Sequence, residues 1–414
     1  MARDLTLLTD LYQLTMMQGY YQYGTDKKVV FDLYYRKNPS GNGYGICAGL
    51  EQAMDYIKNL KFTSQDIQYL RNLDMFSDDF LNYLSTFRFT GDIYAIPEGT
   101  VVFPNEPLMR VCAPMIEAQY VETALLNIIN HQSLIATKAA RVVKAAEGDP
   151  VLEFGLRRAQ GPDAGIYGAR AAVIGGCVAT SNVLTGKLFD VPVAGTQAHS
   201  WVMSFDTELE AFRAYANVFP NKCVLLVDTY DTLKSGVPNA IKVFDEIKAS
   251  GKELKNHGIR LDSGDLAYMS KNARKLLDEA GHQDAVISAS SDLDEYLIAD
   301  LKRQGAKITL WGVGTKLITS QDCPAFGGIY KLSAEENEQG VFEPRIKISD
   351  NPEKVTTPGI KKVIRIYDKA THKIKADLIT LAHEEFDVSQ DLTIFDPKAT
   401  WKKMKLVGGT YEVR

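Results

Sequence analysis

The sequence predicts an α/β protein with a (β/α) barrel-like domain and a second, α+β domain built from both chain ends. Through the middle of the chain, short runs rich in β-branched residues alternate with helix-like segments, the pattern of βαβ units around a parallel sheet. These runs recur at spacings of roughly 20–40 residues, which favours a barrel. Near both ends, strand-like alternation takes over. We place the catalytic barrel at 116–324 and the flanking domain at 1–115 together with 325–414.

The elements of this fold can be followed in chain order. After a helix-like start comes the strand-like run "KKVVFDLYYRK" (27–37), and the long helical stretch 115–148 leads into the barrel. Beyond residue 325, runs such as "GGIYKLSA" (327–334) predict a β-rich end. Polar clusters follow the barrel strands, at the carboxyl ends where barrels and open doubly wound sheets alike bind ligands. The predicted barrel strands are 151–158, 175–183, 191–200, 223–232, 258–266, 285–294 and 307–317.

Composition excludes several classes of function. The chain has 414 residues, 45% hydrophobic and 24% charged, as is usual for a soluble globular protein. Its net charge of −5 disfavours nucleic-acid binding, so any anionic ligand must be bound by local cations. The five cysteines lie at neither disulfide nor metal-site spacings. Asp4 and Asp10 interrupt the N-terminal apolar run, and no apolar stretch approaches the roughly 18 residues of a membrane helix. We therefore expect a cytoplasmic protein without membrane or nucleic-acid partners.

Two strand ends carry groups suited to anions. Arg157 and Arg158 close the first barrel run, and paired guanidinium groups match carboxylates or phosphates, although a surface ion pair would explain them equally well. In "WGVGTKL" (311–317), Gly312 and Gly314 precede Thr315. Backbone N–H groups and a hydroxyl at a helix start form a phosphate cradle, and the last units of a barrel are its usual place.

Carboxylates follow two further strands. Asp228 and Asp231 in "LVDTYDTL" could bind magnesium or a sugar hydroxyl, or cap the next helix. In "IRLDSGDL" (259–266), Arg260 stands beside Asp262 and Asp265. Capping alone needs no preceding arginine, so we favour a functional role for this cluster over a structural one.

His199 stands in "GTQAHSWVMSF" (195–205), directly after a predicted strand. A lone histidine is more often structural than catalytic. Zinc is disfavoured because no further ligand lies at the right spacing, and a dyad with Ser200 is disfavoured because adjacent side chains point apart. Nucleophilic or acid–base use of the imidazole remains.

Seven motifs in this order resemble those of the nicotinate phosphoribosyltransferases, a family of type II phosphoribosyltransferases. The resemblance runs from about residue 5 to about residue 365, and many bacterial members continue past the position of Arg414. It implies that the chain joins nicotinate to phosphoribosyl pyrophosphate, giving nicotinate mononucleotide and pyrophosphate in NAD salvage. It also implies coupling to ATP hydrolysis through a phosphohistidine. The motifs are "LLTDLYQLTM", "EFGLRRAQGPDAG", "GTQAHSWVMSF", "LVDTYDTL", "IRLDSGDL", "GVGTKL" and "GGIYKL".

The resemblance assigns roles to individual residues. His199 matches the phosphorylated histidine, Tyr12 the tyrosine that packs on the nicotinate ring, and Thr196 and Arg260 the positions that bind nicotinate. Thr315 matches the residue that holds the phosphoribosyl phosphate.

Further roles follow from the same resemblance. Gly312 and Gly314 would supply backbone donors to the 5-phosphate, and Asp262 and Asp265 would orient ribose hydroxyls or magnesium in catalysis. Arg157 and Arg158 would add positive charge.

The resemblance also implies Mg²⁺, ATP as co-substrate and a homodimer. Two alternatives stay open: a nicotinamide-using phosphoribosyltransferase of the same fold, and a non-catalytic barrel protein that senses a phosphorylated nucleotide.

Overall fold

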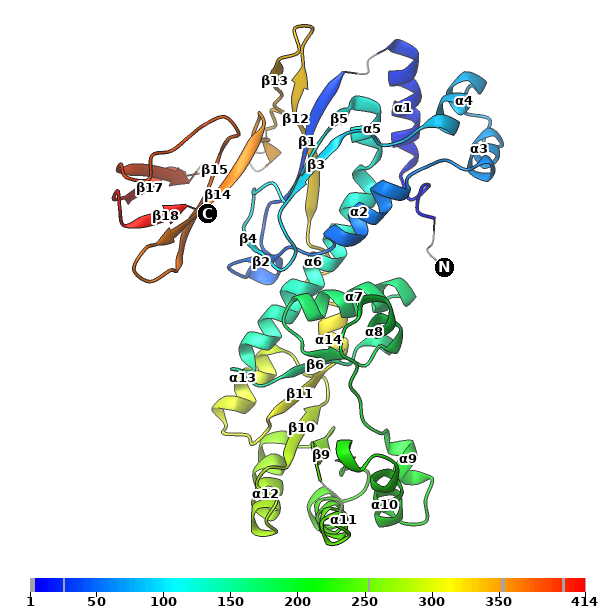
Figure 1. Ribbon diagram of the computed structural model, residues 1–414, viewed down its shortest axis with the longest axis vertical. Coiled ribbons are helices and arrows are strands. Elements are labelled where there is room, and N and C mark those ends of the chain that lie inside the picture. The colour runs from blue at the N-terminus through cyan, green and yellow to red at the C-terminus, as the bar shows by residue number, and fades with distance from the viewer. Residues whose placement is uncertain (1–3, 25–26, 252–253, 351–353, 397–398, 414) are drawn as a thin grey trace. The chain divides into compact units, whose positions relative to one another are not determined.

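The computed structural model describes residues 4–24, 27–251, 254–350, 354–396 and 399–413 (Figure 1). Contacts along the chain divide it into two units. One unit comprises Met1–Asn130 and Phe326–Arg414, and the other comprises His131–Ala325. None of the helices in these ranges has both the length and the apolar character needed to cross a membrane.

The middle unit contains a six-stranded sheet whose strand pairs are all parallel. Its order is β7-β6-β11-β10-β9-β8, so the first and last strands of the unit, β6 and β11, lie side by side. That pairing is typical of a singly wound barrel and absent from an open doubly wound sheet. The predicted α/β barrel-like fold is confirmed. The strands are β6 (Val151–Glu153), β7 (Ala179–Thr180), β8 (Val224–Leu226), β9 (Gly258–Leu261), β10 (Val286–Ser290) and β11 (Leu310–Val313).

The barrel has one open seam. A single parallel bridge joins Thr180 at the end of β7 to Val193, and no ladder connects Val193 to β8 within the described residues. Residues 194–198 follow the bridge without regular secondary structure and lead to α9 (His199–Met203). The segment that carries Thr196 and His199 therefore lies along this seam rather than within a strand, because its backbone is not engaged in a sheet.

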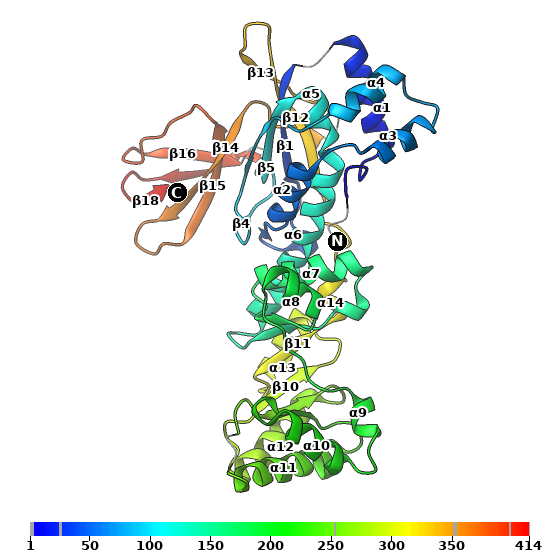
Figure 2. The ribbon, with the colours of Figure 1, turned by 45° about the vertical axis from the view of Figure 1, so that its right-hand side comes forward.

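Helices surround this sheet, and polar side chains in the preceding loops cap several of them. Asn182, Thr207, Asp265 and Asp294 each accept a backbone N–H in the first turn of the next helix. Figures 1 and 2 show α10, α11 and α12 side by side near β9. The helices are α7 (Pro162–Ile174), α8 (Val183–Phe189), α10 (Glu208–Val218), α11 (Val237–Ala249), α12 (Leu266–Glu279), α13 (Glu295–Arg303) and α14 (Thr315–Ile318). Short helical turns are η2 (Leu156–Arg158), η3 (Pro220–Lys222) and η4 (Thr232–Gly236).

The other unit is built on an antiparallel five-stranded sheet in the order β13-β12-β1-β5-β3. Its central strand β1 pairs with β12 from the far end of the chain, with Val29 opposite Glu335. The predicted second domain, built from both ends of the chain, is therefore confirmed. The strands are β1 (Lys28–Tyr35), β3 (Asp92–Ala95), β5 (Met109–Pro114), β12 (Gly328–Glu336) and β13 (Phe342–Pro344), with the small pair β2 (Gly45–Ile46) and β4 (Val101–Val102). The helices are α1 (Leu11–Tyr23), η1 (Pro39–Gly41), α2 (Leu50–Asn59), α3 (Ser64–Arg71), α4 (Asp78–Thr86) and α5 (Met115–Tyr120). The long helix α6 (Glu122–Ala145) begins in this unit and continues into the middle one.

The last strands form a three-stranded sheet, β15-β14-β18, and a hairpin of β16 and β17. A small apolar cluster of Ile366, Leu406 and Tyr411 joins the two. Two buried ion pairs, Lys361–Asp32 and Arg365–Asp377, reinforce this end of the chain. The strands are β14 (Lys361–Asp368), β15 (Ile374–Leu381), β16 (Leu392–Asp396), β17 (Ala399–Leu406) and β18 (Tyr411–Val413).

Candidate active site

The carboxyl ends of three adjacent strands bring polar side chains together. Asp228 and Thr229 follow β8, Asp262 follows β9, and Ser290 ends β10. Parallel strands present their carboxyl ends at one edge of the sheet, where barrel enzymes hold their active sites. His199 joins this edge from the first position of α9.

His199 is held at both ring nitrogens. Its Nδ1 lies 3.1 Å from the Thr229 hydroxyl, and its Nε2 lies 3.6 Å from Oδ2 of Asp262. The histidine side chain is 39% exposed and that of Asp262 is 33% exposed. The imidazole is therefore oriented by a hydroxyl and a carboxylate and is still accessible to a ligand, as a catalytic group must be.

Asp262 is itself fixed by its neighbours. Its Oδ1 accepts a hydrogen bond from the Ser290 hydroxyl, and its backbone N–H donates to Oδ2 of Asp228 at 2.8 Å. The same Asp228 oxygen accepts from the hydroxyl of Ser263 at 2.7 Å. These bonds hold the turn after β9 in one conformation.

Arg260 lies on β9 and reaches toward the open seam. Its Nη1 donates to the Thr196 hydroxyl and, at 3.1 Å, to the carbonyl of Gln197, while Nη2 lies 3.7 Å from Oδ1 of Asp262. Burial lowers the pKa of the Arg260 guanidinium, against the opposing effect of Asp262 and Asp228, yet an arginine stays charged at any physiological pH. The structure thus brings together four of the predicted residues: Thr196, His199, Arg260 and Asp262.

Several buried polar atoms of this cluster have no hydrogen-bond partner within the described ranges. They are Nε of Arg260, Oδ1 of Asp228 and both amide atoms of Gln197. Buried polar groups are normally satisfied, so a group of unsatisfied ones at a strand end is typical of a site that binds a polar ligand.

The predicted arginine pair lies on the turn η2 after β6. Both side chains are exposed, and neither Arg157 nor Arg158 forms an ion pair with a carboxylate that the structure describes. The charge of Arg157 contributes to lowering the pKa of Arg260, so positive charge gathers at this edge. The turn is held by the buried Glu153, whose carboxylate accepts from the backbone N–H of Gly155 and, at 2.6 Å, from the hydroxyl of Thr180.

Gly312 and Gly314 flank the end of β11. A Cβ atom at Gly312 would lie 2.6 Å from the ring of Phe154, and one at Gly314 would lie 3.2 Å from the Phe154 carbonyl oxygen. Close packing against Phe154 therefore accounts for both glycines, whether or not their N–H groups also meet a ligand. Thr315 begins the four-residue helix α14, and its neighbour Lys316 is paired with Asp294 at 2.7 Å.

Two carboxylates have a structural role. Asp265 is exposed and accepts the backbone N–H of Tyr268 at 2.9 Å as the N-cap of α12, and Asp231 accepts that of Lys234 at 3.0 Å. No hydrogen bond or ion pair connects Asp265 to His199 or Asp262 in the ranges described. The capping interpretation fits Asp265, whereas Asp262 contacts the histidine.

Two residues of the site were not singled out by the sequence. Thr229 stands beside Asp228 in "LVDTYDTL", and Ser290 closes the strand in "SASSDLDE". Hydroxyl residues are common at strand ends, so only the three-dimensional contacts with His199 and Asp262 distinguish them.

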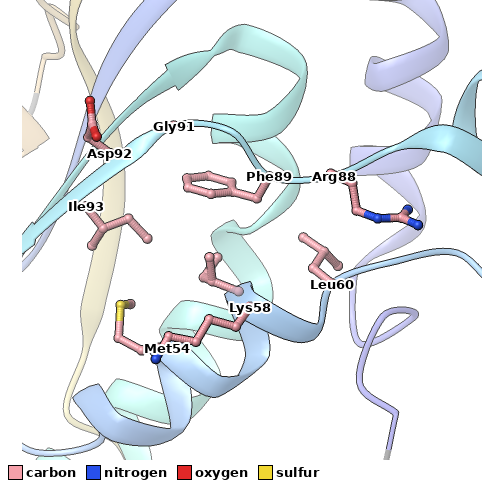
Figure 3. A pocket seen from close by; sticks show the side chains of 9 residues that line it. Met54, Lys58, Leu60, Arg88, Phe89, Gly91, Asp92 and Ile93 are labelled. Carbon is pink, nitrogen blue, oxygen red and sulfur yellow. The ribbon is translucent and has the colours of Figure 1, made fainter.

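Tyr12 belongs to the other unit, where it lies on α1 and is 48% exposed. That unit also contains a cavity of about 380 Å³ between α2 and β3, which includes none of the predicted site residues. Figure 3 shows the ring of Phe89 toward its middle and the guanidinium of Arg88 pointing outward. Its lining residues are Met54, Ile57, Lys58, Leu60, Arg88, Phe89, Gly91, Asp92 and Ile93.

Comparison with known sequences decides the family. Over 400 residues the chain is 54% identical to the nicotinate phosphoribosyltransferase of Bacillus subtilis (strain 168), covering 96% of this chain and 80% of that protein. The chain belongs to the nicotinate phosphoribosyltransferase family. The human nicotinate phosphoribosyltransferase is 33% identical over 454 residues, which cover 95% of this chain and 82% of the human protein. The resemblance drawn from the seven motifs is thus confirmed.

Other comparisons agree with membership of the nicotinate phosphoribosyltransferase family. Profiles described as the N-terminal and C-terminal domains of nicotinate phosphoribosyltransferase match residues 7–130 and 360–413. The crystal structure of human nicotinic acid phosphoribosyltransferase superposes with a TM-score of 0.84 at 29% identity, over 98% of this chain and 87% of that one. A nicotinate-nucleotide pyrophosphorylase from Pyrococcus furiosus shares the fold, with a TM-score of 0.71 at 21% identity over 99% of this chain and 90% of that one.

Proposed function

We propose that this chain joins nicotinate and phosphoribosyl pyrophosphate to give nicotinate mononucleotide and pyrophosphate, in NAD salvage, with ATP hydrolysis coupled through a phosphohistidine at His199. The observation that carries the proposal is the accessible His199 ring between Thr229 and Asp262, beside the buried Arg260. The enzyme is expected to work as a homodimer in the cytoplasm.

His199 serves as the phosphoryl acceptor. An imidazole nitrogen attacks the γ-phosphorus of ATP, so a P–N bond forms as the bond to the bridging oxygen breaks and ADP leaves. The Asp262 carboxylate, 3.6 Å from Nε2, stabilises the positive charge that develops on the ring. Hydrolysis by water later releases phosphate and restores the histidine.

Arg260 provides the cation for the nicotinate carboxylate. Its Nε has no partner within the described residues, and Thr196 and Gln197 hold the guanidinium in place. A guanidinium fork matches a carboxylate in two parallel hydrogen bonds, whereas the amide of nicotinamide offers no negative charge. The site should therefore discriminate strongly against nicotinamide. Tyr12 would pack on the pyridine ring.

Phosphoribosyl pyrophosphate would be held by the groups at the neighbouring strand ends. Arg157 and Arg158 would attract its phosphates, and Thr315 with the backbone at Gly312 and Gly314 would hold the 5-phosphate. As the nicotinate nitrogen bonds to C1 of the ribose, the bond from C1 to the pyrophosphate oxygen breaks. Positive charge then builds on the sugar, where nearby carboxylates stabilise it electrostatically.

Mg²⁺ fits the donors at this edge only as an ion shared with the substrate. The described residues contain no group of three or more side chains that could hold a metal by themselves. Magnesium, however, is commonly bound by one or two carboxylates together with substrate phosphates. Asp228, whose buried Oδ1 has no partner in the part of the chain that the structure describes, and Asp262 would be those ligands. Bound there, the ion would neutralise the pyrophosphate leaving group. Asp265 would support the same turn by capping α12.

A turnover assay tests the proposal. Purified protein is supplied with phosphoribosyl pyrophosphate and ATP, with either nicotinate or nicotinamide, and mononucleotide and pyrophosphate are measured. We expect product from nicotinate and a kcat/KM at least about 100-fold lower for nicotinamide. A preference for nicotinamide would replace the substrate assignment. Ligand binding without pyrophosphate release would favour the nucleotide-sensing alternative.

A further inference from the structure

Two consecutive residues after β8 contact both members of the His199–Asp262 pair. The Thr229 hydroxyl lies 3.1 Å from Nδ1 of His199. The preceding residue, Asp228, accepts from the backbone N–H of Asp262 at 2.8 Å and from the hydroxyl of Ser263 at 2.7 Å. One dipeptide therefore binds the ring of the histidine and the backbone of its carboxylate partner.

We propose that Asp228 and Thr229 are positioning residues for phosphoryl transfer, an inference that rests on the proposed function of His199. Thr229 fixes the orientation of the imidazole and supports the tautomer that Asp262 favours. Asp228 holds the turn that presents the Asp262 carboxylate to the ring.

The tautomer follows from the chemistry of the two partners. An ionised carboxylate can only accept hydrogen bonds, so the proton of a neutral imidazole is more stable on Nε2, which faces Asp262. Nδ1 then carries the lone pair that attacks phosphorus. In the resting protein this lone pair accepts the hydrogen bond that the Thr229 hydroxyl donates, and that bond is released as the P–N bond forms. Without this donor, the ring loses its second anchor and can rotate about χ2.

The turn that carries Thr229 is itself fixed to the segment that carries His199. Glu208 begins α10, shortly after α9, and its side chain is buried. The Glu208 carboxylate accepts from the hydroxyl of Ser235 and, at 2.9 Å, from the side-chain amide of Asn239. Ser235 lies in η4, a single π-helical turn that follows Thr229, and such turns are frequent at functional sites. The segment of His199 and the segment of Thr229 are thus joined twice, by the contact between these two residues and by the hydrogen bonds of Glu208.

Close backbone packing keeps the η4 turn in place. A Cβ atom at Gly236 would lie 1.9 Å from the carbonyl oxygen of Val227, so only glycine fits there. Val227 directly precedes Asp228 in the chain. The backbone before the dipeptide and the end of η4 therefore cannot separate without disturbing the position of Thr229.

Replacement of Thr229 tests the inference. Thr229→Val removes the hydroxyl at nearly constant volume, Thr229→Ser restores it, and Asp231→Asn changes a capping residue of the same loop. Two quantities are measured: the single-turnover rate of phosphoryl transfer from ATP to the protein, and the ¹⁵N NMR shifts of the imidazole of His199 without ligands, assigned with His199→Ala. We expect Thr229→Val to slow transfer about tenfold and to shift Nδ1, with Thr229→Ser and Asp231→Asn close to the unmodified protein.

Two substitutions test the proposed role of Asp228. Asp228→Asn keeps an oxygen that can accept from the N–H of Asp262, whereas Asp228→Ala removes it. Transfer should therefore fall less than about fivefold in the first and more than about tenfold in the second, with little change in the KM for ATP. An equal loss in both variants, or a loss confined to KM, would show that Asp228 acts through substrate or metal binding alone and does not position Asp262.

The result that overturns the inference is an unchanged ¹⁵N shift and an unchanged transfer rate in Thr229→Val. Failure of the proposed function gives a different result, because the unmodified protein would then acquire no phosphate at all. In that case the NMR shifts still decide whether the Thr229 hydroxyl donates to Nδ1 of His199, since they are measured without ATP.

Discussion

At the scale of single residues, the proposed function makes Arg260 the cation on which substrate choice depends. Its side chain is 15% exposed, and it is held by Thr196 and Gln197 on one side and lies 3.7 Å from Asp262 on the other. A largely buried guanidinium whose Nε has no partner among the described residues is poised for a carboxylate ligand.

We predict that Arg260→Ala raises the KM for nicotinate by about 100-fold, because removing one partner of a buried charge pair costs about 3 kcal/mol. The KM for phosphoribosyl pyrophosphate should change by less than about threefold. Steady-state kinetics with each substrate varied in turn would measure both. Arg213→Ala, which removes an exposed arginine paired with Glu246, serves as the control. Equal losses for the two substrates would indicate a phosphate-binding role for Arg260.

The two carboxylates of one turn have different roles in this account. Asp262 faces His199, while Asp265 caps α12. We predict that Asp262→Asn slows phosphoryl transfer to His199 about 100-fold and leaves the free energy of unfolding nearly unchanged. Asp265→Ala should do the reverse, lowering the free energy of unfolding by about 1 kcal/mol with transfer within about threefold. Single-turnover labelling and denaturant unfolding of both variants would decide, and a catalytic loss in Asp265→Ala as large as in Asp262→Asn would contradict the assignment.

At the scale of elements, an ion pair between Arg365 and Asp377 joins two of the C-terminal strands. Arg365 on β14 donates to both carboxylate oxygens of Asp377 on β15 and to the carbonyl of Val101. Glu106 is buried next to this pair, and burial together with its hydrogen bond to Asp377 raises the pKa of Glu106 to about 8. The folded protein therefore holds a proton that the unfolded chain releases near its ordinary pKa.

The raised pKa of Glu106 determines how the stability of the protein depends on pH. Between the ordinary pKa of a glutamate, about 4.3, and about 8 the folded state binds more protons than the unfolded state, so stability falls as the pH rises through this window. We predict that Glu106→Gln reduces that decrease by about 4 kcal/mol between pH 5 and pH 8.5. Denaturant unfolding at several pH values would measure it. Parallel pH profiles for the two proteins would show that Glu106 is already ionised in the fold.

Some elements could be predicted from the sequence and others could not. The strands 223–232, 258–266 and 285–294 were predictable because apolar runs end in polar clusters, and each contains an observed strand. The predicted strand 191–200 contributes only the bridge at Val193, since the residues after it contact Arg260 by side chain and carbonyl rather than by a ladder. That outcome depends on a side chain from β9, which local pattern does not encode.

The residues of the site were likewise only partly predictable from the sequence. His199, Arg260 and Asp262 were identifiable because an imidazole follows one predicted strand, and a guanidinium and a carboxylate stand together at the end of another. Thr229 and Ser290 were not, because a hydroxyl at a strand end has many uses. Asp265 looked equivalent to Asp262 in sequence, and only the direction of its side chain toward the N–H of Tyr268 separates them.

At the scale of the whole molecule, two pairings between distant segments define the architecture. β6 pairs with β11, which makes the middle unit a barrel, and β1 pairs with β12, which builds the other unit from both chain ends. The order of βαβ units predicts the first pairing, and strand-like runs at both ends predict the second. The register of each pair is set by long-range packing, which no local signal contains.

The central claim is that His199 carries phosphate during turnover. Protein is incubated with ATP, nicotinate and phosphoribosyl pyrophosphate, quenched without acid, digested and examined by mass spectrometry. His372→Ala, which removes a histidine that is 65% exposed and lies in the C-terminal strands, is the matched control for His199→Ala. We predict acid-labile phosphate on the peptide that contains His199, present in His372→Ala and absent from His199→Ala. Phosphate on another residue, or ATP hydrolysis in step with product in His199→Ala, would contradict the account.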